Sequence, residues 1–253
     1  MSKATEARLQ TAFAPSSARR IDPFRIAFFG GSFDPPHNGH LQIASAVADR
    51  FELNEIWFEP AGLQPLKDPS SLSSYEDRFE MTRLACATDP VYASRFVAHR
   101  HDAPRRDGLP NYTVDALIAL NNSLALSHND ALFCIVGIDA FRGLDRWHRP
   151  VRLLGQAQWI ICSRPGSTLS IDEVERVLPP CNITPISDFD LAAFDCAGEK
   201  FSTRLYLFDH VHVDISSTHI REGIRAGGST RAEAESMLPP AVAAYIHDHN
   251  LYQ

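Results

Sequence analysis

The stretch from Gly30 to His40, which reads GGSFDPPHNGH, constrains the fold of this chain more than any other feature. It follows the apolar run Phe24 to Phe29, which is typical of a buried strand. The next residues, Leu41 to Phe51, carry apolar side chains at the spacing of an amphipathic helix. We therefore expect a strand, a glycine-rich turn and a helix in immediate succession.

The composition of this turn suits an enzyme that handles a nucleoside triphosphate. Gly30 and Gly31 lack the Cβ atoms that would keep a ligand from the backbone, and the start of a helix attracts phosphate through free N–H groups and its dipole. His37 and His40 each add a donor that can become cationic near neutral pH. Their HxGH spacing within this longer string is far more specific than a lone histidine.

The bulk properties point to one soluble domain. A chain of 253 residues can bury a sizeable α/β core, and we expect a single domain over residues 23–253 after a flexible tail over residues 1–22. The tail is rich in Ala, Ser and Arg like an organelle transit peptide, but Glu6 and the lack of an apolar face favour a plain tail. The formal charge of −7 argues against nucleic-acid or anionic-membrane partners.

No apolar run approaches the roughly 18 residues of a spanning helix, and no signal-peptide core follows Met1, so we expect a cytoplasmic protein. The five cysteines include no CxxC pair, and buried thiols in a reducing compartment explain them. The pairs His99/His101 and His210/His212 alternate as in a strand, but neither has a third ligand nearby in the sequence. We therefore predict no metal site.

Strand-like and helix-like segments alternate along the chain, which predicts a Rossmann-like, doubly wound parallel α/β sheet with C-terminal helices. Ser73 and Glu76 have the spacing of a capping box for one of the helices. The further strands are expected at Glu55 to Glu59, Arg95 to His99, Ala131 to Val136 and Gln158 to Cys162, with late pieces at Leu205 to Leu207 and Val211 to Val213. The further helices are expected at about Ser74 to Ala87, from Asn111 or Thr113 to Leu120, and at Ser170 to Leu178, Ser217 to Ala226 and Pro239 to Asn250.

In such a sheet, ligands bind beyond the carboxyl ends of the strands, where the strand order reverses. Besides the turn at Gly30, two strand ends carry glycine or polar residues, at Gly137 to Asp139 and at Ser163 to Gly166. The segment Pro179 to Ser202 contains several acidic residues, and we interpret it as an irregular, solvated excursion, with contact to substrate or a partner subunit as the alternative.

A second phosphate-binding pattern lies near the C-terminus, where Ile215 to Arg221 reads ISSTHIR. Ser216 and Ser217 can cap a helix, and Arg221, one turn further on, can bring a planar cationic fork to a phosphate oxygen. Such a cap in isolation is usually structural. Its combination with HxGH in one chain favours a phosphate site.

Together, these two strings resemble the nucleotidyltransferase superfamily, whose (H/T)xGH and ISSTxxR motifs bind ATP. From Ile26 to Tyr252 the chain is similar to one family of that superfamily, the nicotinate-nucleotide adenylyltransferases. The residues that carry this similarity also include the loop near Lys67, Arg78, Met81, Asn111 to Thr113, Val136 to Asp139, Trp147, Cys162 to Gly166 and the ending from Leu238 to Tyr252.

The resemblance implies that ATP and nicotinate mononucleotide react to give deamido-NAD and pyrophosphate, with Mg²⁺ on the triphosphate. The attacking phosphate is already an anion, so positioning and charge stabilisation suffice for catalysis. By resemblance, His37 and His40 would be the catalytic residues. The ATP site would comprise these histidines with Gly30, Gly31, Ser32, Phe33, Gly137, Asp139, Arg164, Ile215, Ser216, Ser217 and Arg221.

The resemblance also implies a site for the pyridine nucleotide opposite ATP. Trp147 would stack on the ring, Tyr112 and Thr113 would offer backbone donors to the carboxylate, and Lys67 would add a cation. The alternative for Trp147 is a loop anchor in the core. The stretch Ala61 to Lys67 reads AGLQPLK and lacks the Asn and His of the Asn-x-x-Pro-Pro-His-Lys found in many members, so beyond Lys67 the contacts of this loop are not carried over.

Three other functions remain to be weighed. A sibling nucleotidyltransferase would use nicotinamide mononucleotide, phosphopantetheine or glycerol phosphate, but such small siblings generally lack the Trp147 region and this length of chain. A non-catalytic nucleotide-binding module would not need His37, His40, Ser216 and Arg221 intact. A class I aminoacyl-tRNA synthetase would need a longer chain and a mobile lysine-rich loop. A homo-oligomer is compatible with the sequence.

Overall fold

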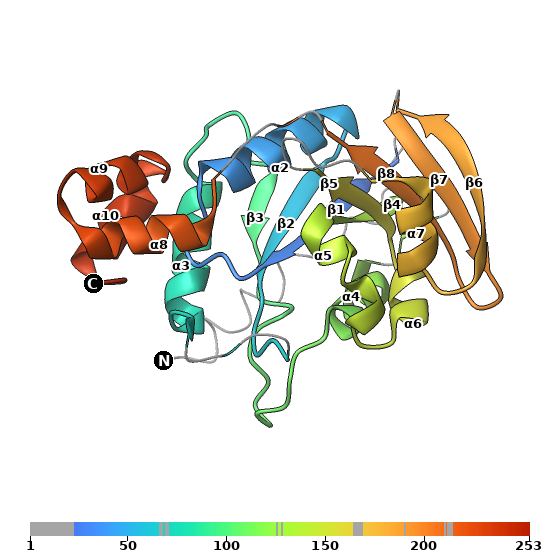
Figure 1. Cartoon of the computed structure of the whole chain (residues 1–253), viewed down its shortest axis with the longest axis horizontal. Coiled ribbons are helices and arrows are strands. Elements are labelled where there is room, and N and C mark those ends of the chain that lie inside the picture. The colour runs from blue at the N-terminus through green and yellow to red at the C-terminus, as the bar shows by residue number, and fades with distance from the viewer. Residues whose placement is uncertain are drawn as a thin grey trace, which may run out of the picture.

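The chain is built around one eight-stranded sheet with the strand order β3-β2-β1-β4-β5-β8-β7-β6 (Figure 1). The computed structural model describes residues 23–65, 68, 71–124, 126–127, 129–163, 169–189, 191–209, 211 and 215–253. The strands are β1 (Arg25–Gly31), β2 (Glu55–Pro60), β3 (Phe96–Ala98), β4 (Ala131–Gly137), β5 (Gln158–Cys162), β6 (Cys181–Asp188), β7 (Leu191–Gly198) and β8 (Ser202–Phe208). The helices are α2 (Asn38–Arg50), α3 (Tyr75–Cys86), α4 (Thr113–Leu124), α5 (Ile138–Phe141), α6 (Pro150–Leu154), α7 (Ile171–Val177), α8 (Ser217–Ala226), α9 (Gly228–Ser236) and α10 (Pro240–Asp248).

Six of the strands run parallel, from β3 through β2, β1, β4 and β5 to β8. β2 pairs with one side of β1, and β3 pairs with the far side of β2. β4 pairs with the other side of β1. The strand order therefore reverses between β1 and β4, which is where a doubly wound sheet forms its ligand crevice. This arrangement confirms the predicted α/β fold class.

Side-chain alternation along β1 divides the core into two layers. Ile26 and Phe28 belong to an apolar cluster with residues of α4, α5, α6 and α7 on one face of the sheet. Ala27 and Phe29 belong to a second cluster with residues of α2 on the other face. Since successive side chains of a strand point to opposite faces, the buried part of a parallel strand covered on both sides must be apolar throughout, as Ile26 to Phe29 of β1 and Leu132 to Val136 of β4 are.

The interpretation of Pro179 to Ser202 as an irregular excursion was wrong. This segment contains the two antiparallel strands β6 and β7, and β7 pairs with β8 to extend the parallel sheet. Two of the acidic residues that suggested a solvated loop are held by one cation, because Arg204 lies 2.7 Å from Asp188 and 2.6 Å from Asp195. The apolar residues of β7 alternate between the two core clusters, with Ala193 on one face and Phe194 on the other.

The C-terminal helices α8, α9 and α10 gather with α3 at one end of the molecule, opposite the β6–β7 hairpin (Figure 1). Met81 of α3, Ile220 of α8 and Ile246 of α10 belong to the apolar cluster of this end. The expected stop after Ala226 is present, since Gly227 has a φ of 73°, which favours glycine. Helix α9, which begins at the next residue, was not predicted.

One local prediction needs correction, and others fall outside the described residues. The N-cap of α3 is Ser74, whose hydroxyl accepts from the Asp77 N–H, rather than Ser73. The tail over residues 1–22, the predicted site residues Lys67 and Arg164, the pair His210/His212 and most of the strand piece Val211 to Val213 lie outside the described residues.

Asp34, in the turn after β1, attaches the C-terminal helices to the sheet. Its side chain is 1 % exposed, and one carboxylate oxygen accepts a 2.6 Å hydrogen bond from the Tyr252 hydroxyl. The other oxygen accepts from the Ser73 N–H at 3.2 Å. The Asn38 N–H at the start of α2 donates to the Met237 carbonyl after α9 at 2.9 Å. The turn and the C-terminal unit are therefore joined directly.

Replacing Tyr252 with Phe should lower the free energy of unfolding by about 1–3 kcal/mol, because a buried carboxylate oxygen loses its partner. Urea unfolding of the whole chain measures this. Tyr245→Phe is the matched control, since it removes a 3.0 Å bond between α10 and the half-buried Asp77 and should cost less. Equal losses in the two variants would show that Asp34 has no special part in docking this unit.

Candidate active site

The turn after β1 is held in an unusual backbone conformation. Phe33 has a φ of 47°, a left-handed value that is rare for a bulky residue. Its ring, 2 % exposed, packs on Phe29 with ring centroids 5.6 Å apart and on His40 at 5.0 Å. A Cβ on Gly30 would lie 2.7 Å from the buried Phe28 ring, so the position requires glycine. Phe33, predicted to bind ATP, therefore offers a ligand its backbone and not its side chain.

The two histidines of HxGH form the cap of helix α2. His37 is the N-cap residue and is buried, and its N–H donates to Nδ1 of His40 at 3.2 Å. The two rings stack, with centroids 3.7 Å apart and planes at 27°. Both imidazoles are therefore fixed at the N-terminal end of α2, where the free N–H groups of the first turn attract anions.

His40 is held as a neutral donor. Burial, with a smaller effect of His37, holds the pKa of His40 well below its usual range. Because Nδ1 accepts the hydrogen bond from His37, the proton of the neutral ring lies on Nε2. The expectation that this side chain becomes cationic near neutral pH does not agree with these contacts, and His40 presents an uncharged N–H instead.

The structure brings the second motif against this turn. Ser216 caps α8 by accepting from the His219 N–H at 3.2 Å. Ser217 Oγ donates to the Pro35 carbonyl at 2.8 Å, and Arg221 Nη1 donates to the Asp34 carbonyl at 2.8 Å. Two helix N-termini, those of α2 and α8, thus meet at the carboxyl end of β1, with Ile215 half-buried before the second.

Gly137 ends β4, the strand beside β1, and is the N-cap of α5. It is exposed, and a Cβ there would meet nothing within 4 Å. Asp139 follows in the first turn of α5 and is also exposed. Both residues lie at the carboxyl edge of the sheet, at the switch point that β1 and β4 define.

Tyr112 and Trp147 lie at the same edge of the sheet. The Tyr112 ring stacks on His148, with centroids 4.0 Å apart, and His148 directly follows Trp147. Trp147 is half-buried and packs against the apolar cluster of the α4 face. It therefore anchors its loop while part of its ring remains exposed. Thr113 begins α4.

Sequence reasoning did not predict that Asp34 and Arg78 hold the turn after β1 in place. Arg78 is 3 % exposed, and its guanidinium donates to the Ser32 carbonyl at 2.8 Å and to the Ser73 carbonyl at 3.1 Å. It therefore ties the turn to the loop before α3. A cavity of about 350 Å³ beside it, the Arg78 cavity, is lined by residues that include Gly62, Gln64, Ser73, Tyr75, Arg78 and Arg105.

Gly62 lies where the loop after β2 approaches Asn111. A Cβ on Gly62 would lie 2.5 Å from Asn111 Oδ1 and 2.7 Å from the Asp102 carbonyl. Asn111 Oδ1 accepts from the Leu63 N–H at 3.1 Å, and the Asn111 N–H donates to the Leu63 carbonyl at 2.9 Å. The stretch before Tyr112 thus fixes one wall of the Arg78 cavity.

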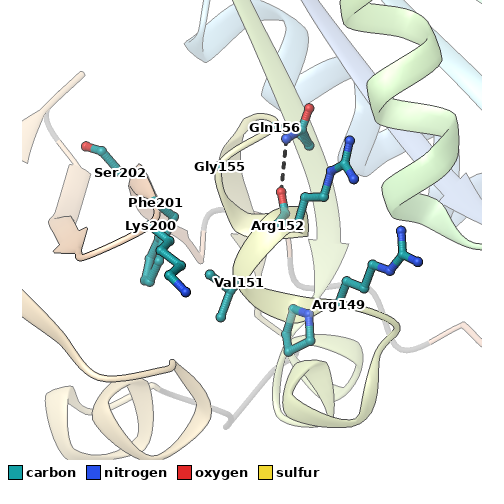
Figure 2. Close-up of a pocket in the computed structure, with 9 residues that line it drawn as sticks. Arg149, Val151, Arg152, Gly155, Gln156, Lys200, Phe201 and Ser202 are labelled. Atoms are coloured by element: carbon teal, nitrogen blue, oxygen red, sulfur yellow. Dashed lines mark hydrogen bonds between the residues drawn. The ribbon is translucent and has the colours of Figure 1, made fainter.

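A larger cavity, of about 620 Å³, lies elsewhere. Figure 2 shows its lining from α6 and from the turn between β7 and β8, including Arg152 and Lys200. Gly155 and Gln156 precede β5, and Ser202 begins β8, so this cavity opens at the amino edge of the sheet. None of the predicted site residues that the structure describes lines it. Its greater volume does not make it the active site.

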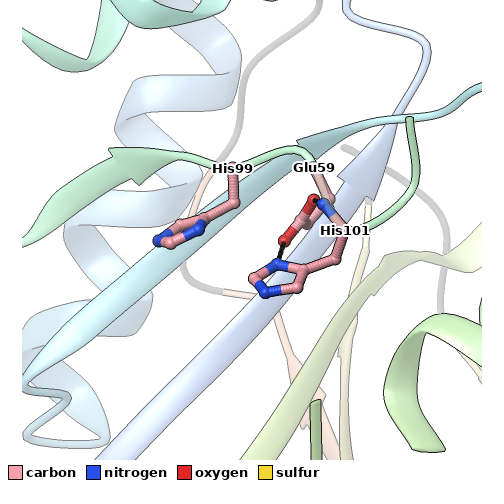
Figure 3. A group of neighbouring side chains, drawn as sticks. All are labelled: Glu59, His99 and His101. Carbon is pink, nitrogen blue, oxygen red and sulfur yellow. Dashed lines mark hydrogen bonds and ion pairs between the residues drawn. The ribbon is translucent and has the colours of Figure 1, made fainter. Parts of the chain in front are cut away.

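A cluster of titratable groups lies at the ends of β2 and β3 (Figure 3). Burial raises the pKa of Glu59, although its hydrogen bonds to His101 partly offset this effect. Burial and the charge of Glu59 raise the pKa of Asp102 to about 7. Burial, with a smaller effect of His101, lowers the pKa of His99 to about 4. Sequence reasoning singled out the two histidines but missed Glu59, which belongs to a different strand and is distant from them in the sequence.

Comparison with known proteins agrees with this architecture. A model of the cytidylyltransferase-like family matches residues 28–223. Three bacterial proteins named as probable nicotinate-nucleotide adenylyltransferases are similar over most of their length. That of Pectobacterium atrosepticum is 34 % identical over 91 % of this chain and 100 % of its own, that of Geobacter sp. 35 % over 90 % and 98 %, and that of Laribacter hongkongensis 36 % over 90 % and 94 %.

The chain belongs to the cytidylyltransferase-like family and, within it, to the nicotinate-nucleotide adenylyltransferases. A solved structure with the same fold is Plasmodium falciparum nicotinic acid mononucleotide adenylyltransferase complexed with NaAD, at a TM-score of 0.67 and 18 % identity over 90 % of this chain and 97 % of that one. The same Plasmodium protein complexed with APC superposes with a TM-score of 0.65 at 17 % identity, with the same coverage of both chains. In the part of this adenylyltransferase-family chain that the structure describes, no helix is long and apolar enough to cross a membrane.

The free protein should show His40 as the neutral tautomer with its proton on Nε2. In nitrogen-edited NMR spectra of the imidazoles, this state should persist as the pH falls through about 6.5, the ordinary histidine value. Comparison with His40→Ala assigns the resonance. A His40 signal that becomes cationic at or above that pH would contradict the cap geometry.

Proposed function

We propose that this protein transfers the AMP part of ATP to nicotinate mononucleotide and releases deamido-NAD and pyrophosphate. The observation that carries the proposal is the contact between the two phosphate-binding motifs, through Ser217 on Pro35 and Arg221 on Asp34. The names of the bacterial relatives support the same reaction. ATP and nicotinate mononucleotide are the proposed partners, in a single cytoplasmic domain over residues 23–253.

In this reaction a phosphate oxygen of the mononucleotide attacks the α-phosphorus of ATP, and the bond to the pyrophosphate leaving group breaks. The attacking oxygen is already ionised, so no side chain has to remove a proton. The fixed Nε2–H of His40 donates to the negative charge that builds on the phosphoryl oxygens. His37 acts through its place at the N-cap of α2, where the backbone N–H groups face the same anion.

The β- and γ-phosphates fit the N-terminus of α8. Ser216 and Ser217 lie at its first turn, and Arg221 follows one turn later with a guanidinium that already reaches the turn after β1. The backbone dipole and this cation together offset the charge of the leaving pyrophosphate. Arg221 therefore has two roles: its guanidinium would bind the phosphates, and it also joins the two motifs through its bond to the Asp34 carbonyl.

The site suits a Mg²⁺ ion that is carried by the triphosphate rather than held by side chains of the turn. Mg²⁺ prefers oxygen ligands and keeps several waters, whereas the nearest side chains of the turn, His37 and His40, offer nitrogen. The buried Asp34 carboxylate is already bonded to Tyr252 and Ser73. Mg²⁺ would supply charge neutralisation along the phosphates and would be held chiefly by their oxygens and by water.

The pyridine nucleotide fits the part of the edge between the Arg78 cavity and the loop of Trp147. The exposed part of the Trp147 ring and the Tyr112–His148 stack offer flat surfaces for a heteroaromatic ring. Backbone donors at the start of α4, around Thr113, suit a carboxylate. This chemistry favours the acid over the amide form of the substrate.

The proposed function is tested with purified full-length protein, ATP and Mg²⁺. Nicotinate mononucleotide, nicotinamide mononucleotide and phosphopantetheine are offered in turn, and pyrophosphate and the dinucleotide product are both measured. Rapid turnover with nicotinate mononucleotide is expected. Turnover with phosphopantetheine alone would reject the proposal, and faster turnover with the amide would reassign the substrate.

His40→Ala should lower kcat by about a hundredfold or more, with a smaller effect on the KM for ATP, because a preorganised donor matters most when charge builds in the transition state. His249→Ala, at an exposed position in the turn after α10, is the control. Steady-state titration of ATP at saturating mononucleotide measures both constants. Near-normal kcat in the variant would remove His40 from the catalytic machinery.

Trp147→Ala should raise the KM for nicotinate mononucleotide about tenfold and leave the ATP dependence nearly unchanged, because a stacking surface is lost. The half-buried position also predicts a lower thermal midpoint. Titration of each substrate beside a melting curve separates these effects. If stability falls and both substrates weaken alike, Trp147 is a loop anchor only.

A further inference from the structure

The polar cluster at the ends of β2 and β3 contains a set of metal-binding donor atoms that the adenylyl transfer does not use. One carboxylate oxygen of Glu59 and one ring nitrogen each of His99 and His101 all lie within 4.8 Å of one another. Two imidazoles and one carboxylate are a donor set that divalent transition metals favour. Figure 3 shows the three side chains near one another at the ends of the two neighbouring strands, with Glu59 and His101 in direct contact.

The pairing of β2 with β3 brings these side chains together. Trp57 pairs in register with Val97, and the His99 N–H donates to the Phe58 carbonyl at 2.9 Å, which continues the parallel ladder past β3. Since side chains alternate along a strand, Glu59 lies on the same face as Trp57, and His99 on the same face as Val97. A fixed sheet edge thus aligns donors from two strands.

The rings and the carboxylate are also held in orientation. The Trp57 ring stacks on His99 with centroids 4.0 Å apart and on His101 at 5.1 Å. Glu59 accepts from the His101 N–H at 3.0 Å, and its other oxygen lies 2.6 Å from His101 Nδ1. The stacking on Trp57 restricts the His99 ring before any ligand binds, which lowers the entropy cost of binding a cation. The bond between Glu59 and the His101 ring would be exchanged for bonds to the ion.

The charge around Glu59 favours a cation. Its side chain is fully buried, and Asp102, another acid, is 7 % exposed nearby. Among the described residues, the only basic group that pairs with Glu59 is His101. The neighbouring arginines are engaged elsewhere, since Arg100 pairs with Glu76 and Arg78 donates to backbone carbonyls. Glu59 has hydrogen bonds to His101, but ionising a fully buried carboxylate remains costly, and a bound cation would offset that cost.

We propose that Glu59, His99 and His101 bind one divalent transition-metal ion, with Zn²⁺ as the best match. A tetrahedral zinc site with bonds of about 2.0–2.1 Å needs donor atoms roughly 3.3 Å apart. The donors therefore have to close by about 1.5 Å at most, which rotation of the partly exposed His101 side chain assists. Three protein ligands leave a fourth position for water.

This site is separate from the proposed triphosphate site. Trp57 belongs to the apolar cluster on the α4 face of the sheet, whereas Phe29 and Phe33, which contact His40, belong to the cluster on the α2 face. Mg²⁺ bound with ATP would not compete for it, because Mg²⁺ disfavours imidazole ligands.

The test uses the whole protein after treatment with a chelator and dialysis. Titration with Zn²⁺ should show one ion bound per chain and raise the thermal midpoint by roughly 5 °C at saturation, whereas Mg²⁺ should do neither. Co²⁺ should give the visible d–d absorption of a low-coordinate site. Glu59→Gln, His99→Ala and His101→Ala should each weaken Zn²⁺ binding by about a hundredfold.

Two controls keep the result specific. Glu52→Gln changes an exposed carboxylate shortly before β2, and His249→Ala removes an exposed histidine far along the chain, and neither should alter Zn²⁺ binding. Glu59→Gln keeps an acceptor for the His101 N–H, and each variant is compared with itself with and without Zn²⁺, so a loss of stability alone does not decide the outcome. Absence of binding, weak binding at several equivalents, or equal binding by all variants would show that Glu59 and His101 form only a structural pair.

Discussion

The buried carboxylate of Asp34 is the interaction on which the active-site geometry depends. It accepts from the Tyr252 hydroxyl near the C-terminus and from the Ser73 N–H before α3, and its own carbonyl accepts from Arg221 of α8. A carboxylate buried without such partners would be strongly unfavourable. The turn after β1 therefore reaches its final shape only when α3 and the C-terminal helices have docked, and the two phosphate-binding helix ends are positioned by the same contacts.

The parallel part of the fold could be predicted because its signals are local. Ala131 to Val136 is a continuous apolar run, and the string from Gly30 to His40 follows such a run directly, so each strand and the switch point are visible in a few adjacent residues. The β6–β7 hairpin could not be predicted in this way. Its acidic residues suggest a loop until Arg204, on the next strand, is known to pair with two of them, Asp188 and Asp195.

The same distinction applies to the site, where Asp34 lies inside the first motif but has partners 39 and 218 residues away. Glu59 was missed for a related reason, because its partnership with His99 and His101 depends on the register between β2 and β3.

The cap geometry also limits how His40 can assist catalysis. Protonation of Nδ1 would break the hydrogen bond that the ring accepts from the His37 N–H and would loosen the first turn of α2. The negative charge of a bound triphosphate favours a cationic imidazole, but it also strengthens the demand for an intact helix N-terminus. A neutral donor on Nε2, with the charge supplied by two helix ends and Arg221, satisfies both requirements.

The cluster at Glu59 is linked to the active-site edge through the chain that follows it. The Ala61 N–H donates to the Gly31 carbonyl at 2.8 Å, and Gly62 packs closely against the side chain of Asn111, which precedes Tyr112. The end of β2 therefore sets both the turn after β1 and one wall of the Arg78 cavity. A cation held by Glu59, His99 and His101 would fix the ends of β2 and β3 against each other, and its effect would pass to the substrate side through these backbone contacts rather than through the chemistry at phosphorus.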